Sequence, residues 1–252
     1  MISKNQLKHL HSLRLKKFRD LNQAFVVEGI KMADEILQSN FRIIEIFGTA
    51  GWFSSHQDLV NSRGILFHEI TDAELTRASS LTSPNEVIVI ASIPELTLPE
   101  PGLMGKIILI LDRIQDPGNL GTIVRTADWF GIRHIFASED TADLFNPKVI
   151  QATMGSAFRI SLHYRDLSSF IRESLGSWNI YGATAGGENI YTAEISFPAA
   201  VIIGNESQGI SEEILSIVPR KIGIPSFSGG AESLNASVAA GILCSEFIRR
   251  MN

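Results

Sequence analysis

Residues 224–251 read IPSFSGGAESLNASVAAGILCSEFIRRM and combine a Gly-containing loop with an Ala-rich helical pattern. The Ile-Pro pair is typical of a strand end, and Gly229 and Gly230 follow in the loop. Ser233 or Asn235 can cap the helix, whose free N-terminal amides would then face a polar group. The stretch therefore predicts either a ligand loop that leads into a packed helix, or an ordinary Gly-rich turn before a core helix.

Two other stretches place polar residues at the end of an apolar run. Residues 107–131, IILILDRIQDPGNLGTIVRTADWFG, predict a strand, a polar loop and an amphipathic helix that bears Arg125. Residues 199–211, AAVIIGNESQGIS, predict another strand, which ends at Gly204. Together they favour the ligand-loop interpretation of residues 224–251.

The three stretches carry motifs that occur in one order in a known family. They are N-x-G-x-x-x-R-T-A at residues 119–127, I-G-N-E-x-x-G at residues 203–209, and I-P followed by E-S-L-N-x-S-V-A-A-G-I at residues 232–242. In these motifs the chain resembles the SpoU/TrmH class of RNA 2′-O-ribose methyltransferases, members of the SPOUT superfamily. One departure is the segment 226–232, which is a residue longer than in common members and lacks their Met after Pro225.

The resemblance implies S-adenosylmethionine as cofactor, which carries its own activated methyl group. Three residues match the positions whose backbone holds the cofactor, and three more are their polar neighbours: Gly204, Ile224 and Leu234, then Asn205, Ser233 and Asn235. Plain core packing is the alternative interpretation of the two apolar residues in this set.

Arg125 lies beside the apolar side of its predicted helix, where a cation needs a partner or an anion. The resemblance implies that Arg125 is the catalytic Arg, with Asn119 and Glu206 fixing its orientation. A guanidinium, with a pKa above about 12, is a poor base. We therefore expect Arg125 to bind a phosphate and stabilise the forming alkoxide, while Glu206 or water receives the proton. A surface Arg, or an ion pair with Glu206 or Asp128, is the structural alternative.

Composition indicates a folded chain that is acidic overall. The 252 residues are 44% hydrophobic and 19% charged, with a net charge of -5, which argues mildly against nucleic-acid binding. The first 20 residues nevertheless contain six Lys and Arg against one Asp, a local net charge of +5. Leu7, Leu10, Leu13 and Phe18 there predict an amphipathic helix with a basic outer face, in preference to a transit peptide.

Residues 21–95 alternate strand-like and helix-like segments. The segments 25–28, 43–47, 66–69 and 87–91 predict strands, and residues 29–38 and 72–78 predict helices. The runs FVVEG at residues 25–29 and TSPN at residues 82–85 resemble landmarks of the family's small RNA-binding domain, which is similar to ribosomal protein L30e. The alternative is a structural module without RNA contact.

Pro-rich residues 96–105 predict a linker between residues 1–95 and a second domain, residues 106–252. In the second domain unbroken apolar strands alternate with helices, which predicts an α/β domain with a parallel sheet covered on both faces. No G-x-G-x-x-G or Walker motif follows a strand. The resemblance implies instead a trefoil-knotted SPOUT methyltransferase domain, and a homodimer formed through it.

Other chemistries find no support in the sequence. The six His residues have no ligand spacing, so no metal is predicted, and there is no nucleophile elbow. Cys244 is the single Cys, which fits a reducing cytoplasm, and no apolar run reaches the length of a membrane span.

Two functions remain. The first is S-adenosylmethionine-dependent methylation of a ribose 2′-hydroxyl in structured RNA, with ribosomal RNA favoured over transfer RNA. The second is a catalytically inactive RNA-binding or ribosome-assembly protein of the same fold, which would be free to lose the motif residues.

Overall fold

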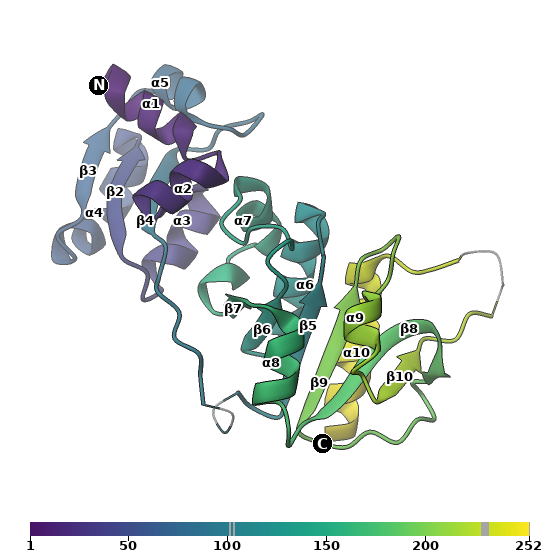
Figure 1. The fold of residues 1–252 in the computed structure, drawn as a ribbon. Helices are drawn as coiled ribbons and strands as arrows, with labels where there is room; N and C mark the ends of the chain where they lie inside the picture. The colour runs from purple at the N-terminus through teal and green to yellow at the C-terminus, as the bar shows by residue number, and fades with distance from the viewer. Residues whose placement is uncertain (101, 103, 228–231, 252) are drawn as a thin grey trace. The chain divides into compact units, whose positions relative to one another are not determined.

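The structure is a computed structural model that describes residues 1–100, 102, 104–227 and 232–251. The chain forms two compact units (Figure 1). The first contains Met1–Glu95 and Asp143–Phe158, and the second contains Leu96–Ala142 and Arg159–Asn252. The predicted Gly229 and Gly230 of the C-terminal loop lie outside the described residues.

The first unit begins with two short helices, α1 (Lys4–Ser12) and α2 (Lys16–Asn22). Ser3 and Gln6 form a capping box at the start of α1, because each side chain bonds the backbone N–H of the other. Leu10 and Leu13 are buried, which confirms the predicted apolar side of this segment.

Arg19 corrects the prediction that the basic residues of this segment lie outside. Its side chain is only 2% exposed and pairs with Asp143, to which Nε donates at 2.9 Å. Nη1 donates to the carbonyl oxygens of Leu13 and Arg14 at 2.9 and 2.8 Å. A buried guanidinium is tolerated here because its donors are paired. The exposed basic residues of the segment are Lys4, Lys8, Lys16 and Lys17.

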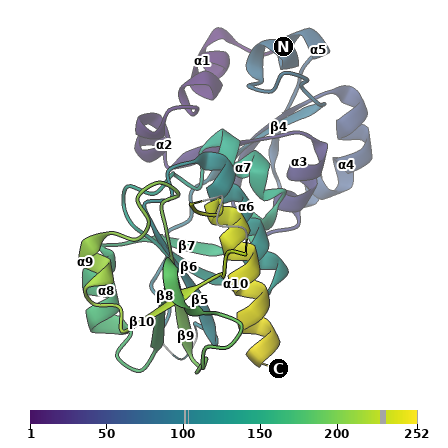
Figure 2. The ribbon, with the colours of Figure 1, turned by 90° about the vertical axis from the view of Figure 1, so that its right-hand side faces the viewer.

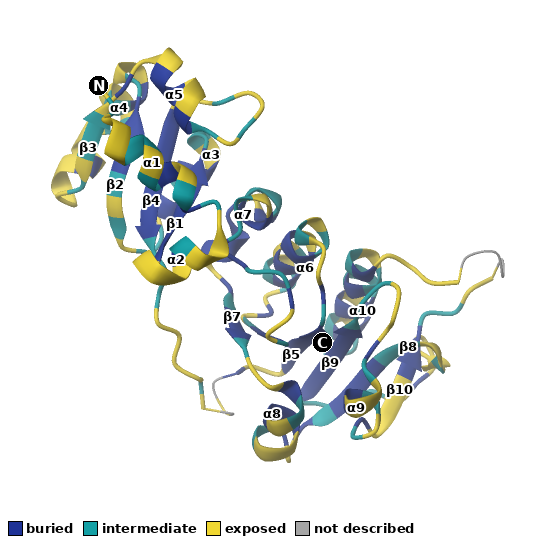
Figure 3. Ribbon diagram, turned by 45° about the horizontal axis from the view of Figure 1, so that its top comes forward, coloured by how far each residue is buried: buried dark blue, intermediate teal, exposed yellow. Residues whose placement is uncertain are grey.

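A four-stranded sheet forms the core of the first unit, in the order β1-β4-β2-β3. The strands are β1 (Ala24–Glu28), β2 (Ile43–Gly48), β3 (Leu66–Glu69) and β4 (Val87–Ser92). β2 and β3 are parallel, and the other pairs are antiparallel. Burial is deepest in the neighbouring strands β1 and β4, as Figure 3 shows: all five residues of β1 are buried, whereas no residue of the edge strand β3 is.

Three helices accompany this sheet: α3 (Ile30–Leu37), α4 (Ala50–Ser62) and α5 (Asp72–Ala78). The sequence predicts α3 and α5 but not α4. The α4 sequence, AGWFSSHQDLVNS, is rich in weak helix formers, and only Trp52 and Val60 are buried, so no helical apolar period is visible. Thr49 caps α4, its side chain accepting from the Trp52 N–H.

The segment Asp143–Phe158 packs within the first unit although it lies in the sequence between strands of the second. It contains α7 (Pro147–Thr153) and a 3-10 turn, and α7 packs against β1. The Phe145 ring lies 4.5 Å from that of Phe25, and the Phe158 ring 5.5 Å from that of Phe41. The sequence assigns this segment to residues 106–252, because nothing in its pattern shows which core its apolar residues join.

The second unit is built on a six-stranded sheet, in the order β10-β8-β9-β5-β6-β7. The strands are β5 (Ile107–Asp112), β6 (His134–Ala137), β7 (Ser161–Tyr164), β8 (Asn179–Asn189), β9 (Ala199–Gly204) and β10 (Arg220–Gly223). Every neighbouring pair is parallel, as the sequence predicts. All six residues of β5 are buried, which explains its unbroken apolar run.

Helices cover both faces of this sheet (Figure 2). Strand residues such as Ile108, Ile110 and Ile202 join one apolar cluster with α8 (Leu167–Ser174) and α9 (Glu212–Leu215). On the other side, α6 (Pro117–Trp129) and α10 (Ala236–Met251) pack against each other. The fold is therefore the predicted α/β class. The trefoil knot implied by the resemblance stays a prediction.

The last turns of α10 are held by a buried carboxylate. Glu246 accepts from Arg249 and Arg250, which lower its pKa to about 2. Arg250 also donates to the carbonyl oxygens of Ile190 and Ala193. These bonds fix the C-terminal helix to the loop that follows β8. No helix among the described residues has the length and apolar character needed to cross a membrane.

His163 on β7 is the feature of this core most sensitive to pH. Its ring is buried, stacks on Phe136 at 5.0 Å, and has no hydrogen-bond partner on either nitrogen within the described residues. Burial lowers the pKa of His163 to about 4, and the charges of His134 and Arg165 act in the same direction. The folded protein therefore holds this imidazole neutral.

We predict that the free energy of unfolding falls as the pH drops from about 6.5 to about 4. In this pH range His163 is protonated in the unfolded chain but neutral in the folded protein, so acid favours unfolding. The full effect is on the order of a few kcal/mol. Urea unfolding at pH 7.5 and 4.5 measures it, and His163→Phe should lose less stability between these two values than the wild type. An equal loss in both proteins would assign the acid sensitivity to other groups.

Candidate functional site

Three strands of the second unit end at one edge of the sheet, where the motif residues follow them. In the parallel register, Asp112 at the end of β5 lies beside Gly204 at the end of β9. Ile224 directly follows the last residue of β10. Ligands of open parallel sheets bind at the carboxyl ends of the strands. The loops after β5, β9 and β10 are therefore the candidate site.

Asn119 joins the three motifs. Asp116 caps α6 by accepting from the Asn119 N–H at 2.8 Å, which places Asn119 in the first turn of the helix. The Asn119 side-chain amide donates to Glu206 Oε1, and its carbonyl oxygen accepts from Asn235 Nδ2 at 2.9 Å. One side chain thus connects α6, the loop after β9 and the start of α10.

Asn235 also caps α10, as the sequence suggests. Its Oδ1 accepts from the Ser237 N–H at 2.9 Å and from the Ser237 hydroxyl at 2.6 Å. Because its Nδ2 is bonded to Asn119, both ends of the amide are occupied by the protein. Asn235 therefore sets the direction of the helix and keeps Asn119 in place. Ser233 makes only a long contact, 3.5 Å from its hydroxyl to the Glu206 carbonyl oxygen.

Asn205 organises the loop after β9. Its Nδ2 donates to the Arg113 carbonyl oxygen at 3.0 Å, and its Oδ1 accepts from the N–H groups of Ser207 and Gln208 at 2.9 and 3.2 Å. Its side chain, predicted as a polar neighbour of a cofactor, is thus used to fold the loop.

Gly204 is required by the packing of the same loop. A Cβ atom there would lie 2.2 Å from the carbonyl carbon of Gly209 and 2.3 Å from the Ile210 nitrogen. The backbones of Asn205 and Gly209 also bond each other in both directions, which closes the loop. Any side chain at this position would push the loop off the end of β9.

Ile224 and Leu234 flank the undescribed part of the C-terminal loop. Ile224 is half-buried, and Leu234 is 45% exposed. Plain core packing is therefore excluded for Leu234 in one chain. An apolar side chain open to solvent beside hydrogen-bonded polar groups is the lining expected for a ligand with both apolar and polar parts.

Arg125 lies apart from this cluster. It is exposed, and no hydrogen bond or ion pair joins it to Asn119, Glu206 or Asp128 in the part of the chain described. Six residues of helix separate it from Asn119, about 9 Å along the axis. The alternative of a structural ion pair is not found, since Asp128 is paired with Arg133 and Arg159 at 3.3 and 2.9 Å.

Two residues that hold the loops after β5 and β9 together, Asp112 and Arg113, are not among the residues predicted from the sequence. Asp112 is 3% exposed and accepts from the Ser211 N–H at 2.6 Å. Arg113 has a left-handed backbone with φ 59°, and its Nη1 donates to Gln208 Oε1 at 2.9 Å. An Asp directly after a buried strand was the available signal.

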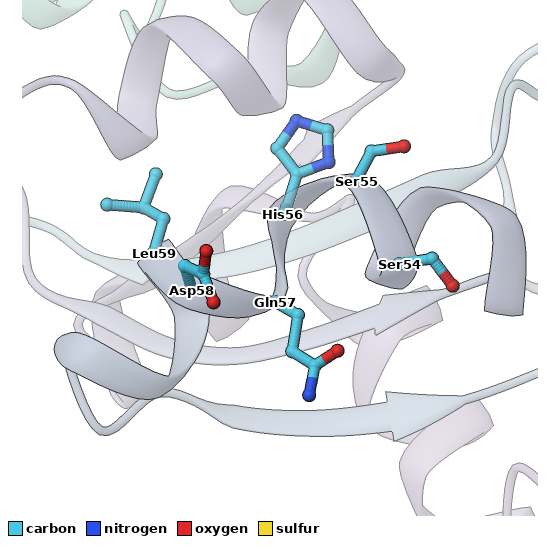
Figure 4. Close-up of a pocket in the computed structure, with 6 residues that line it drawn as sticks. All are labelled: Ser54, Ser55, His56, Gln57, Asp58 and Leu59. Atoms are coloured by element: carbon cyan, nitrogen blue, oxygen red, sulfur yellow. The ribbon is translucent and has the colours of Figure 1, made fainter.

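Two other places among the described residues offer no comparable set of groups. The hollow in Figure 4 is lined by six consecutive residues of α4, whose side chains point in different directions: Ser54, Ser55, His56, Gln57, Asp58 and Leu59. Among the described residues no three His, Cys, Asp or Glu side chains are placed to hold a metal ion. Burial raises the pKa of the Cys244 thiol to about 12, so it stays protonated and unreactive.

Comparison with known proteins agrees with this geometry. The sequence model of the SpoU rRNA Methylase family matches residues 106–245, and that of an MRM3-like substrate binding domain matches residues 4–89. The chain belongs to the SpoU rRNA methylase family.

Individual relatives are similar over the whole chain. The 23S rRNA (guanosine(2553)-2'-O)-methyltransferase RlmP of Bacillus subtilis is 32% identical over 96% of this chain and 95% of its own length. A TrmH-family structure from Porphyromonas gingivalis has a TM-score of 0.87 at 36% identity and covers 99% of both chains. An AdoMet-bound rRNA methyltransferase from Sinorhizobium meliloti has a TM-score of 0.89 at 28% identity, over 100% of this chain and 98% of its own.

We predict that Gly204→Ala lowers the free energy of unfolding by about 1–3 kcal/mol and abolishes S-adenosylmethionine binding, because the added methyl group collides with backbone. Gly176→Ala is the matched control, since no heavy atom lies within 4 Å of the Cβ position there. Urea unfolding and titration calorimetry measure both variants. Wild-type cofactor affinity in Gly204→Ala would show that this loop does not form the site.

Proposed function

We propose that the protein transfers a methyl group from S-adenosylmethionine to a ribose 2′-hydroxyl in ribosomal RNA. The observation that carries the proposal is the hydrogen-bonded contact of Asn119, Glu206 and Asn235, one residue from each motif. Membership of the SpoU rRNA methylase family supports the reaction, and similarity to the B. subtilis RlmP protein over nearly the whole chain supports ribosomal RNA.

The residues at the strand ends fit the cofactor. Its apolar adenine would lie against Leu234 and Ile224, and backbone groups at Gly204, Ile224 and Leu234 would bind its polar edge. The cofactor supplies an activated methyl group, so the protein needs no metal or covalent intermediate. The residues of the protein have to orient the ribose and accept the proton of its 2′-hydroxyl group.

Glu206 is placed to receive that proton. One carboxylate oxygen accepts from Asn119, which holds the side chain in one orientation, and the other has no hydrogen-bond partner within the described residues. Glu206 is half-buried, so a ribose hydroxyl or an intervening water can reach it. The guanidinium of Arg125 instead stabilises the negative charge that forms on the ribose oxygen.

We propose that Arg125 reaches the site from a second copy of the chain. In one chain it lies about 9 Å along α6 from Asn119 and contacts none of the cluster. We therefore propose a homodimer through the second unit, in which Arg125 of one protomer serves the site of its partner. On α10 the exposed Val238 is available for that contact, whereas Ala236 and Ala240 are buried within the chain and are not.

The first unit is proposed to select the RNA. The match of residues 4–89 to a substrate binding domain supports this role, and so do the exposed Lys4, Lys8, Lys16 and Lys17 in a protein of net charge -5. We also propose that the protein acts in the cytoplasm, where it would meet ribosomal RNA. Because Phe145 and Phe158 pack on β1 and its neighbours, a fragment without residues 1–95 would expose apolar surface, so RNA selection has to be tested in the full chain.

We predict that purified protein and S-adenosylmethionine add a 2′-O-methyl group to one ribosomal RNA position that is unmethylated in cells lacking the protein. Mapping of 2′-O-methyl groups in RNA from cells with and without the gene identifies the position, and transfer to that RNA in vitro confirms it. Identical maps, together with no transfer to ribosomal or transfer RNA, would contradict the proposal and favour an inactive RNA-binding protein.

A further inference from the structure

Trp129, the last residue of α6, is 85% exposed. The other two tryptophans, Trp52 and Trp178, are 2% and 8% exposed. An indole offers one of the largest apolar surfaces of any side chain, and Trp is enriched at binding interfaces. The exposed face of Trp129 is therefore available to a ligand, and its surroundings decide which kind.

The surroundings of Trp129 are cationic. Arg125 lies four residues earlier, one helical turn and about 6 Å along the axis, and hence on the same face of α6. Asp128 next to it binds Arg133 and Arg159, whose side chains are 57% and 41% exposed. Three guanidinium groups and one carboxylate give this end of α6 a local charge of +2, in a protein of net charge -5.

An exposed aromatic face among guanidinium groups is the chemistry that binds unpaired RNA. Bases stack on aromatic side chains, and the neighbouring phosphates bind cations. A ribose whose 2′-hydroxyl is to be methylated has to be presented to the site, which favours a nucleotide in a loop or an unstacked one. Arg125 is the residue proposed to reach that ribose, so a base beside it lies within range of Trp129.

We propose that Trp129 stacks on an RNA base adjacent to the methylated nucleotide and thereby positions the ribose for Arg125. The proposal rests on the proposed function, and assigns to the exposed face of α6 the recognition of the RNA strand at the reacting end. It makes Trp129 a binding residue, with no part in proton transfer or cofactor binding.

The buried positions of Trp52 and Trp178 make Trp129 a spectroscopic probe of this contact. In the free protein, iodide should quench the emission of Trp129 selectively, because the other two indoles are shielded. Addition of an RNA oligonucleotide that carries the methylation site should quench the same component and protect it from iodide. Trp129→Phe should remove both responses while it keeps an aromatic ring for stacking.

Steady-state kinetics distinguish a loss of RNA binding from a loss of folded protein. Trp129→Ala should raise the KM for RNA roughly 10-fold or more, as expected for the loss of one stacked base, with the KM for S-adenosylmethionine unchanged. Trp129→Phe should restore most of the RNA affinity. Tyr191→Ala is the matched control, because Tyr191 is an aromatic residue of the same unit, is 48% exposed and takes no part in the proposed RNA contact. This variant should behave as the wild type does.

Two results would overturn the inference. An unchanged KM for RNA in Trp129→Ala, in an enzyme that methylates the RNA, removes Trp129 from recognition and leaves the proposed function standing. Iodide protection of Trp129 in the free wild-type protein, combined with a loss of dimerisation in Trp129→Ala, would show that a second copy of the chain covers it. Conversely, RNA quenching of Trp129 without methyl transfer would support the contact and contradict the proposed function.

Discussion

The hydrogen bonds of the Asn119 side chain are the constraint on which the site depends. An amide has one donor end and one acceptor end, and Asn119 uses the first for Glu206 and the second for Asn235. Neither neighbour could exchange place with the other without leaving a polar group unpaired. Since the three residues belong to α6, the loop after β9 and the start of α10, this single group fixes the relative position of three segments that are up to 116 residues apart in sequence.

In the proposals above, α6 carries two different functions at its two ends. The first turn of α6 holds the cluster around Asn119, and its later turns carry Arg125 and Trp129 on an exposed face. The helix holds Asn119 and Trp129 about 15 Å from each other along its axis. Arg125 lies about 9 Å along the axis from Asn119 and has no ion-pair partner within the described residues. This separation motivates the proposed dimer, in which Arg125 of one protomer serves the site of its partner.

The sequence predicts most of the fold because buried parallel strands leave unbroken apolar runs, as in IILIL before Asp112. It misses α4, whose sequence lacks an apolar period, and it places Arg19 on the surface although Asp143 holds it inside. At the candidate site, the sequence motifs name the residues but do not predict which hydrogen bonds each of them makes. The side chains of Asn205 and Asn235 organise a loop and the start of α10, and the role of Asn205 depends on the Arg113 carbonyl, a partner that no sequence pattern specifies. The membership of Asp143–Phe158 in the first unit is likewise a matter of tertiary packing alone.

The most direct test of the account is a subunit-complementation measurement with two inactive variants. Arg125→Ala leaves the cluster intact, and Asn119→Ala leaves the cation intact. Co-expression with two different affinity tags allows the mixed dimer to be purified, and its rate of methyl transfer to the natural RNA is compared with that of each parent. The account predicts recovery to about half of the wild-type rate, because one of the two sites in a symmetric dimer regains both halves. A mixed dimer as inactive as its parents would contradict the account, since Arg125 would then act only beside the Asn119 of its own chain.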